Sequence, residues 1–222
     1  MPDPAPPSTL IEKTLVFHYK DFPDDAQLML TFSDPDPSKV GSEQAAVAWK
    51  VVDILGKQIG VGDPVKFTSQ LAFGITGLGH DNVVTSNVAA KIAPGQNVAV
   101  NLKNDHAIFD TPTTVPSQKE IVSCENKTGR KQTLSVGFFA GNDYNPTYIW
   151  ENVGASSSVT ARYHPILKAY ITSNMKQGQF LTAGLVTKDP IWQKNLVNLS
   201  NNTQWDIIVN PDTGAYSIDE HK

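Results

Sequence analysis

Large apolar side chains recur at every second position along much of this 222-residue chain. The segments that share the pattern contain Leu15, Phe17 and Tyr19; Leu28, Leu30 and Phe32; Phe67, Leu71, Phe73 and Ile75; Leu134, Val136 and Phe138; and Val159, Ala161 and Tyr163. A period of two buries one face of a β-strand and exposes the other, whereas a helix repeats about every 3.6 residues. The alternation therefore predicts a chain built almost wholly of short strands.

Turn-forming residues separate these segments. Gly-Val-Gly-Asp-Pro at 60–64, Asn-Lys-Thr-Gly at 126–129 and Pro-Asp-Thr-Gly at 211–214 supply the prolines, glycines and side-chain amides that tight turns favour. Only residues 190–199, preceded by Asp189 as a helix cap, favour a helix. Many short strands at this spacing predict an all-β protein, an antiparallel β-sandwich with at most one or two short helical turns.

Several segments of the first half of the chain match segments of the second half. Residues 67–76 fall on residues 163–172 at an offset of 96, and residues 28–32 fall on residues 134–138 at an offset of 106. Between them, Trp49 is matched with Trp150. Because the order of the matches is kept, we predict two related, duplicated halves. Chance similarity among strand-rich segments is the alternative.

The repeat divides the chain into four parts. Residues 1–9 are expected to form a flexible proline-rich arm, 10–104 the first β-sandwich repeat, 105–119 a connector, and 120–222 the second β-sandwich repeat. The sequence leaves open whether the halves form separate sandwiches or one compact unit, and the compact unit is favoured. Exposed sheet edges also make a homodimer a reasonable expectation.

Charge and composition exclude several classes of partner. The formal net charge is −4 and no run of five Lys or Arg occurs, so neither nucleic acid nor an anionic membrane is an expected partner. The N-terminal residues lack the pattern of a signal peptide, no apolar stretch is long enough to span a membrane, and there is one cysteine. These features favour a cytoplasmic protein, in which the sequons at Asn126, Asn198 and Asn201 would be unmodified surface turns.

Known catalytic and metal-binding patterns are missing from the sequence. None of the five histidines stands in a zinc spacing, and the paired carboxylates are too few for a calcium site. The chain has no nucleophile elbow and no glycine-rich phosphate loop. We therefore expect no enzyme activity, no catalytic residues and no metal.

Aromatic rings supply the candidate ligand site. The residues chosen for it are Trp49, Trp150, Tyr163, His164 and Cys124. Rings that converge on a cavity would bind a planar aromatic molecule, and His164 lies between two apolar segments where it could line such a cavity. Cys124 could contact or link a ligand only if it were partly exposed with a lowered pKa. The alternative is that the rings and the thiol are ordinary core.

Strand-and-turn motifs through most of the chain resemble those of an uncharacterised family of basidiomycete (mushroom) proteins. The resemblance lies in residues 49–54, 70–73, 126–129, 136–138, 159–172, 191–196 and 213–218. It implies a β-rich fold and, through coloured fruit-body members, a bound indolone-type chromophore without catalysis. The resemblance does not assign a binding role to any particular residue.

Two functions follow as expectations. The first is a non-enzymatic pigment protein that holds a small planar aromatic ligand, the chromophore, in a pocket lined by rings. The alternative is a cytosolic lectin-like defence protein that binds carbohydrate, which would need solvent-facing tryptophans. The two differ in where the rings point.

Overall fold

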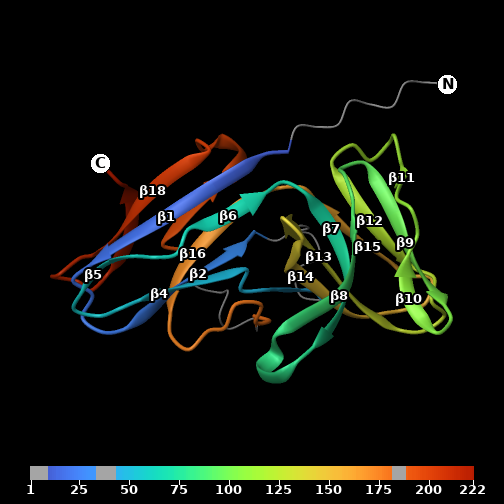
Figure 1. Ribbon diagram of the computed structural model, residues 1–222, viewed down its shortest axis with the longest axis horizontal. Coiled ribbons are helices and arrows are strands. Elements are labelled where there is room, and N and C mark those ends of the chain that lie inside the picture. Colours follow the sequence, from blue (N-terminus) through green and yellow to red (C-terminus); the bar gives the residue numbers. More distant parts are fainter. Residues whose placement is uncertain (1–9, 34–43, 182–188) are drawn as a thin grey trace.

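The computed structural model describes residues 10–33, 44–181 and 189–222. These residues form an all-β protein with two sandwiches side by side (Figure 1), which confirms the predicted fold class. The proline-rich arm at 1–9 lies outside the described residues. No helix in the part of the chain that the structure describes has the length and apolar character needed to cross a membrane.

The first sandwich pairs a sheet in the order β19-β18-β1-β5, with β6 also on β1, and a sheet in the order β17-β16-β2-β4. Its strands are β1 (Glu12–Lys20), β2 (Ala26–Phe32), β4 (Lys50–Ile54), β5 (Ile59–Val61), β6 (Val65–Thr68), β16 (Ile166–Thr172), β17 (Trp192–Asn195), β18 (Asn202–Val209) and β19 (Tyr216–Glu220). Phe17 and Trp205 of one sheet contact Trp192 of the other, at ring-centroid distances of 6.1 and 5.0 Å.

The second sandwich pairs a sheet in the order β3-β14-β13-β7-β8 with a sheet in the order β10-β9-β12-β15, to which β11 adds on β9. Its strands are β3 (Gln44–Ala46), β7 (Leu71–Leu78), β8 (Val84–Lys91), β9 (Gln96–Lys103), β10 (His106–Phe109), β11 (Thr113–Thr114), β12 (Ile121–Asn126), β13 (Gln132–Ala140), β14 (Asp143–Val153) and β15 (Ser158–Arg162). Most strand pairs are antiparallel, but β1–β18 and β9–β12 are parallel.

Helical structure is confined to two short 3₁₀ turns among the described residues, η2 (His80–Asn82) and η3 (Leu196–Asn198). The second falls inside the range predicted to be helical, but it is capped by the Asn195 side chain and not by Asp189. Residues Trp192–Asn195, expected in the helix, form strand β17 because their backbone pairs with β16.

The two sandwiches do not follow the predicted ranges. Strands β1–β6, apart from β3, combine with β16–β19 in the first sandwich, and β7–β11 combine with β12–β15 in the second. Residues 10–104 and 120–222 are therefore not separate sandwiches, because strands of both ranges hydrogen-bond to one another. The connector at 105–119 also contributes β10 and β11 to a sheet. The chain folds as one interlocked unit.

Cross-strand pairs keep the offsets found in the sequence. Leu28 lies opposite Ile171 in the first sandwich, and Leu134 lies opposite Ile75 in the second. Phe32 opposite Leu167 corresponds in the same way to Phe138 opposite Leu71. The register is therefore compatible with the predicted duplication, which stays a prediction.

One part of the sequence alignment does not fit the register. Leu28 lies opposite Val52, whereas its counterpart Leu134 lies opposite Trp150. The residue that corresponds to Trp150 is therefore Val52 and not Trp49. Matching the tryptophans by residue type alone therefore placed them out of register.

Aromatic rings fill the junction between the sandwiches. Phe138 lies with its ring centroid 5.0 Å from that of Phe32 and 4.9 Å from that of Phe67. Trp49 and Tyr163 contact this group from either side. The core of both sandwiches is consequently one continuous cluster, and burial of its rings stabilises the junction.

Candidate functional site

Both tryptophans of the predicted site belong to the core. Trp49 is 3% exposed and its ring lies 5.0 Å from Phe32, while Trp150 is 6% exposed and packs 6.5 Å from Phe73. They lie in different sandwiches, on either side of the aromatic junction. The structure therefore does not bring them together around a ligand.

Tyr163 and His164 do share a cavity. It lies between β13 and the end of β15 and has a volume of about 30 Å³, with Phe32, Phe138 and Tyr148 among its lining residues. Burial raises the pKa of the Tyr163 hydroxyl. A cavity of this size holds about one water molecule, whereas ligand pockets usually measure about 300 Å³ or more. It is too small for a planar ring system.

Cys124 is fully buried in β12, between Val98 of β9 and Val159 of β15. Burial, with a further contribution from the Glu125 carboxylate, raises the pKa of its thiol to about 12. A reactive cysteine needs exposure and a lowered pKa. Cys124 therefore behaves as a small apolar core residue, the alternative that the sequence left open.

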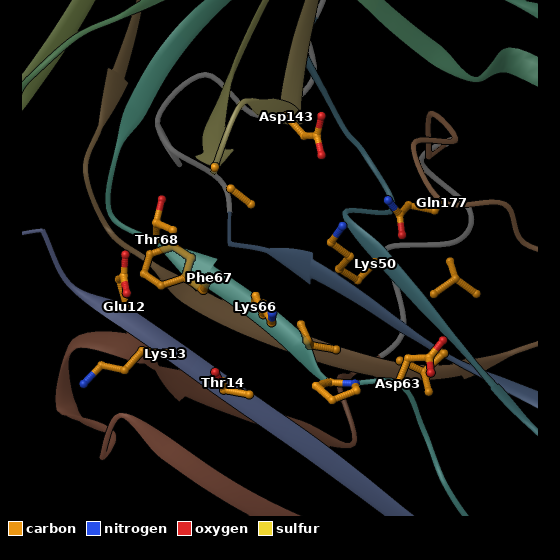
Figure 2. Close-up of a pocket in the computed structure, with 16 residues that line it drawn as sticks. Glu12, Lys13, Thr14, Lys50, Asp63, Lys66, Phe67, Thr68, Asp143 and Gln177 are labelled. Carbon is orange, nitrogen blue, oxygen red and sulfur yellow. The ribbon is translucent and has the colours of Figure 1, made fainter.

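A much larger cleft lies on the open side of the first sandwich (Figure 2). It runs between β4, an edge strand of one sheet, and β6, which lies at the edge of the facing sheet. The β13–β14 turn of the second sandwich contributes Ala140, Gly141 and Asp143 to its lining. The volume of this cleft, about 640 Å³, lies within the usual range for small-molecule sites.

Lys50 is the charged residue that the sheet of β2 and β4 contributes to the lining of this cleft. On β4, Val52 and Ile54 point into the sandwich, and Lys50 stands two residues earlier on the same face, opposite fully buried Leu30. Strand alternation thus directs a lysine towards the space between the two sheets at their open edge. Its ammonium lies 5.7 Å from the centroid of the Trp49 ring, a favourable cation–π distance.

Asn145 holds the Lys50 ammonium in place. Lys50 Nζ donates to Asn145 Oδ1 at 3.0 Å, and Asn145 Nδ2 donates to the Asp143 carbonyl oxygen at 2.9 Å. The second bond fixes which end of the Asn145 amide faces the lysine. Burial lowers the pKa of Lys50, and the negative charge of Asp143 partly opposes that change.

Charges of both signs line the cleft in equal number. Three are lysines, Lys13, Lys50 and Lys66, and three are carboxylates, Glu12, Asp63 and Asp143. Lys13 points away from the cleft in Figure 2, because its ammonium donates to the Leu199 carbonyl oxygen and to Asn201. The remaining groups give no excess of positive charge, so the cleft does not select an anion.

Apolar residues and three uncharged polar side chains form the rest of the cleft wall. The polar ones are Thr14, Thr68 and Gln177, and the apolar ones include Val51, Val52, Pro64, Val65 and Phe67. Because Val52, Val65 and Phe67 are 6%, 3% and 1% exposed, the apolar surface open to a ligand comes mainly from Val51 and Pro64, while the polar groups can fix its orientation.

Sequence reasoning missed this cleft because it followed the aromatic residues. One signal in the sequence could have indicated it. In Lys-Val-Val-Asp-Ile at 50–54, Lys50 shares the inward-facing side of the strand with Val52 and Ile54. A charge on that side is unusual, because inward positions of a sandwich strand are normally apolar. Its partners, Asn145 and Asp143, are distant in sequence and come together only through the interlocked topology.

Metal ligands do not cluster in the parts of the chain that the structure describes: no group of three or more His, Cys, Asp or Glu is placed to hold an ion. Comparison with protein-family models, with curated proteins and with solved structures finds no match. The functional argument therefore depends on the geometry of the cleft.

Proposed function

We propose that this chain is a non-enzymatic small-molecule binding protein and that the cleft beside Lys50 holds its ligand. The supporting observation is the combination of a volume of about 640 Å³ with one half-buried amine, several carboxylates and a wall of mixed polar and apolar residues. A cleft of this kind orients a ligand through a few polar groups and gains affinity from apolar contact.

The ligand that fits these groups is a planar, uncharged aromatic molecule with a carbonyl group. Its ring would lie against Val51 and Pro64, and its carbonyl oxygen would accept a hydrogen bond from Lys50. A ring N–H could donate to the Asp143 or Asp63 carboxylate. An indolone-type chromophore has this arrangement of donor and acceptor, and a pigment role in a fruit body agrees with the resemblance to mushroom proteins, among them the pink chromoprotein of the pink oyster mushroom.

In the described part of the second sandwich, a tyrosine occupies the position that corresponds to Lys50. In the register of the sheets, Leu30 lies opposite Lys50, and the corresponding Val136 lies opposite Tyr148. The Tyr148 ring lines the 30 Å³ cavity, and its hydroxyl donates to the Phe32 carbonyl oxygen at 2.8 Å. If the halves arose by duplication, one site has been filled by tyrosine and the other left open, so we propose one ligand per chain.

Carbohydrate binding is less well supported. The lectin alternative required solvent-facing tryptophans, and Trp49, Trp150, Trp192 and Trp205 are each between 3% and 6% exposed. Stacking of a sugar on any of these rings would need the core to open.

Calorimetric titration with oxindole, a small planar indolone, tests the proposal. We expect saturable binding with one site per chain. Ala140→Trp, which places a large ring in the cleft, should abolish binding, whereas Ala155→Trp on an exposed turn of the second sandwich should not change it. Absence of binding to the unmodified chain, or equal binding to Ala140→Trp, would reject the cleft as the site.

A further inference from the structure

We infer that Lys50 attaches the ligand covalently, through an imine between its Nζ atom and the carbonyl carbon of a planar aromatic aldehyde or ketone. This inference rests on the proposed function, because it concerns the same cleft. It adds the class of ligand, an electrophilic carbonyl compound, and the atom that holds it.

The surroundings of Lys50 differ from those of a lysine in a surface ion pair. Lys127 lies 3.2 Å from the Glu125 carboxylate, and Lys176 lies 2.5 Å from the Asp81 carboxylate. For Lys50 the structure gives a hydrogen bond to the neutral amide of Asn145 and partial burial. An amine that is partly desolvated and bonded to a neutral acceptor loses its proton more readily than one paired with a carboxylate.

The lowered pKa of Lys50 supports this conclusion. Only the neutral amine is a nucleophile, and at neutral pH each unit by which the pKa falls below that of an ordinary lysine raises the free-amine fraction about tenfold. The charged groups that line the cleft with Lys50 are Asp143 from β14, Lys66 and Asp63 from β6 and the preceding loop, and Glu12 and Lys13 from β1. Among these groups, Asp143 raises the pKa of Lys50, and this effect is smaller than the lowering caused by burial.

The reaction balances without an oxidant, reductant or further co-reactant. The Nζ lone pair forms a bond to the carbonyl carbon, and the carbonyl π electrons move to oxygen, which takes up a proton. Nitrogen gives up its proton, and the carbinolamine loses its hydroxyl group with another proton as water. The products are one C=N bond and one water molecule, which can leave through the open side of the cleft.

The Asp143 carboxylate has a defined part in the product. An imine nitrogen can be protonated, and the resulting cation would take the place of the lysine ammonium near Asp143. Figure 2 shows Lys50 and Asp143 on the same side of the cleft, on β4 and at the start of β14. Protonation extends the charge of an aromatic imine over its ring, so a carboxylate nearby would stabilise the coloured form.

Reductive trapping tests the inference. The whole chain is incubated at neutral pH with indole-3-carbaldehyde and sodium cyanoborohydride, and the adducts are located by intact mass and peptide mapping. We expect the first adduct at Lys50, formed before any adduct at an exposed lysine, because more of its amine is neutral. Lys50→Arg should lose this adduct, whereas Lys57→Arg, on the exposed β4–β5 turn, should keep it.

The outcomes separate the two proposals. If oxindole binds and Ala140→Trp blocks it, but Lys50 is labelled no faster than Lys57, the imine inference is rejected and the binding function stands. If neither oxindole nor the aldehyde associates with the cleft, the binding function itself fails. Thermal unfolding of Lys50→Arg, with a midpoint near that of the unmodified chain, checks that loss of labelling is not loss of folding.

Discussion

Lys50 of β4 donates a hydrogen bond to Asn145 of β14, and this bond joins the edge of the first sandwich to the second. The cleft is therefore shaped by both sandwiches, although most of its wall belongs to the first. An inward lysine on an edge strand also discourages pairing with another chain. That role needs only the charge, so Lys50→Arg would preserve it while removing the nucleophilic amine.

Replacement of Asp143 should change the acidity of Lys50 in a defined direction. Because the Asp143 carboxylate raises the pKa of Lys50 against the larger effect of burial, Asp143→Asn should lower that pKa further. The free-amine fraction at neutral pH would then rise. Reductive methylation with ¹³C-formaldehyde, followed by NMR over a pH series, measures this pKa directly. A pKa that rises or stays constant in Asp143→Asn would contradict the electrostatic account of the cleft.

Asn126 should be essential for stability. Its side chain is fully buried and donates to the carbonyl oxygens of Arg130, Val153 and Gly154, while its oxygen accepts from Thr128. Asn126→Ala leaves several buried carbonyls without this donor, and we expect a loss of about 2–4 kcal/mol in the free energy of unfolding. Urea denaturation measures it. Asn198→Ala, at an exposed position, is the control and should change stability by less than about 0.5 kcal/mol.

The same residue corrects an expectation about the sequons. Asn198 and Asn201 are exposed, as a surface turn requires, but Asn126 is 0% exposed. Its amide makes the central hydrogen bonds of the turn that joins β12 to β13. Asn-Lys-Thr at 126–128 therefore has a structural role and cannot present a free amide to solvent in the folded chain.

Cys124 should be inert in the folded protein. Its thiol is buried and its pKa is raised to about 12, so almost no thiolate exists at neutral pH. We expect Ellman's reagent to react with Cys124 only after unfolding in guanidinium chloride. Rapid labelling of the native chain would show that the second sandwich opens around β12, and would revive the thiol as a ligand contact.

The continuous core predicts that both sandwiches unfold together. Leu167 is fully buried on β16, opposite Phe32 at the aromatic junction. Leu167→Ala should cost about 2–5 kcal/mol through the cavity it leaves, with fluorescence and circular dichroism still reporting one coincident transition. Leu102→Ala, at a position 37% exposed, is the matched control with a much smaller effect. Two separate transitions would mean that the sandwiches are independent units.

Alternation predicted the strands well because burial on one face is a local property of the sequence. Leu28, Leu30 and Phe32 lie in one strand, as expected, and this strand pairs with β16 of the second half. The exchange of strands between the predicted halves was not predictable in the same way, because strand alternation does not specify which neighbour a strand selects. Trp49 and Trp150 illustrate the same limit. Both are tryptophans, but the residue that corresponds to Trp150 in the strand register is Val52.

The candidate site was predicted poorly for a physical reason. Rings bury large areas, so they are drawn to the core and pack against one another, as Trp49 does against Phe32. The cleft is instead indicated by Lys50, a charged residue at an inward-facing position of a strand, where an apolar residue is usual. Tyr163 and His164 lie beside a cavity, but its volume is only about 30 Å³, and Tyr148 forms part of its wall.

The occupancy of the cleft in protein purified from its native source tests the central claim most directly. Mass spectrometry under non-denaturing conditions, with an absorption spectrum of the same sample, should show one small ligand per chain and an absorption band beyond that of tryptophan. The mass of the bare chain together with a spectrum of aromatic side chains alone would contradict the account.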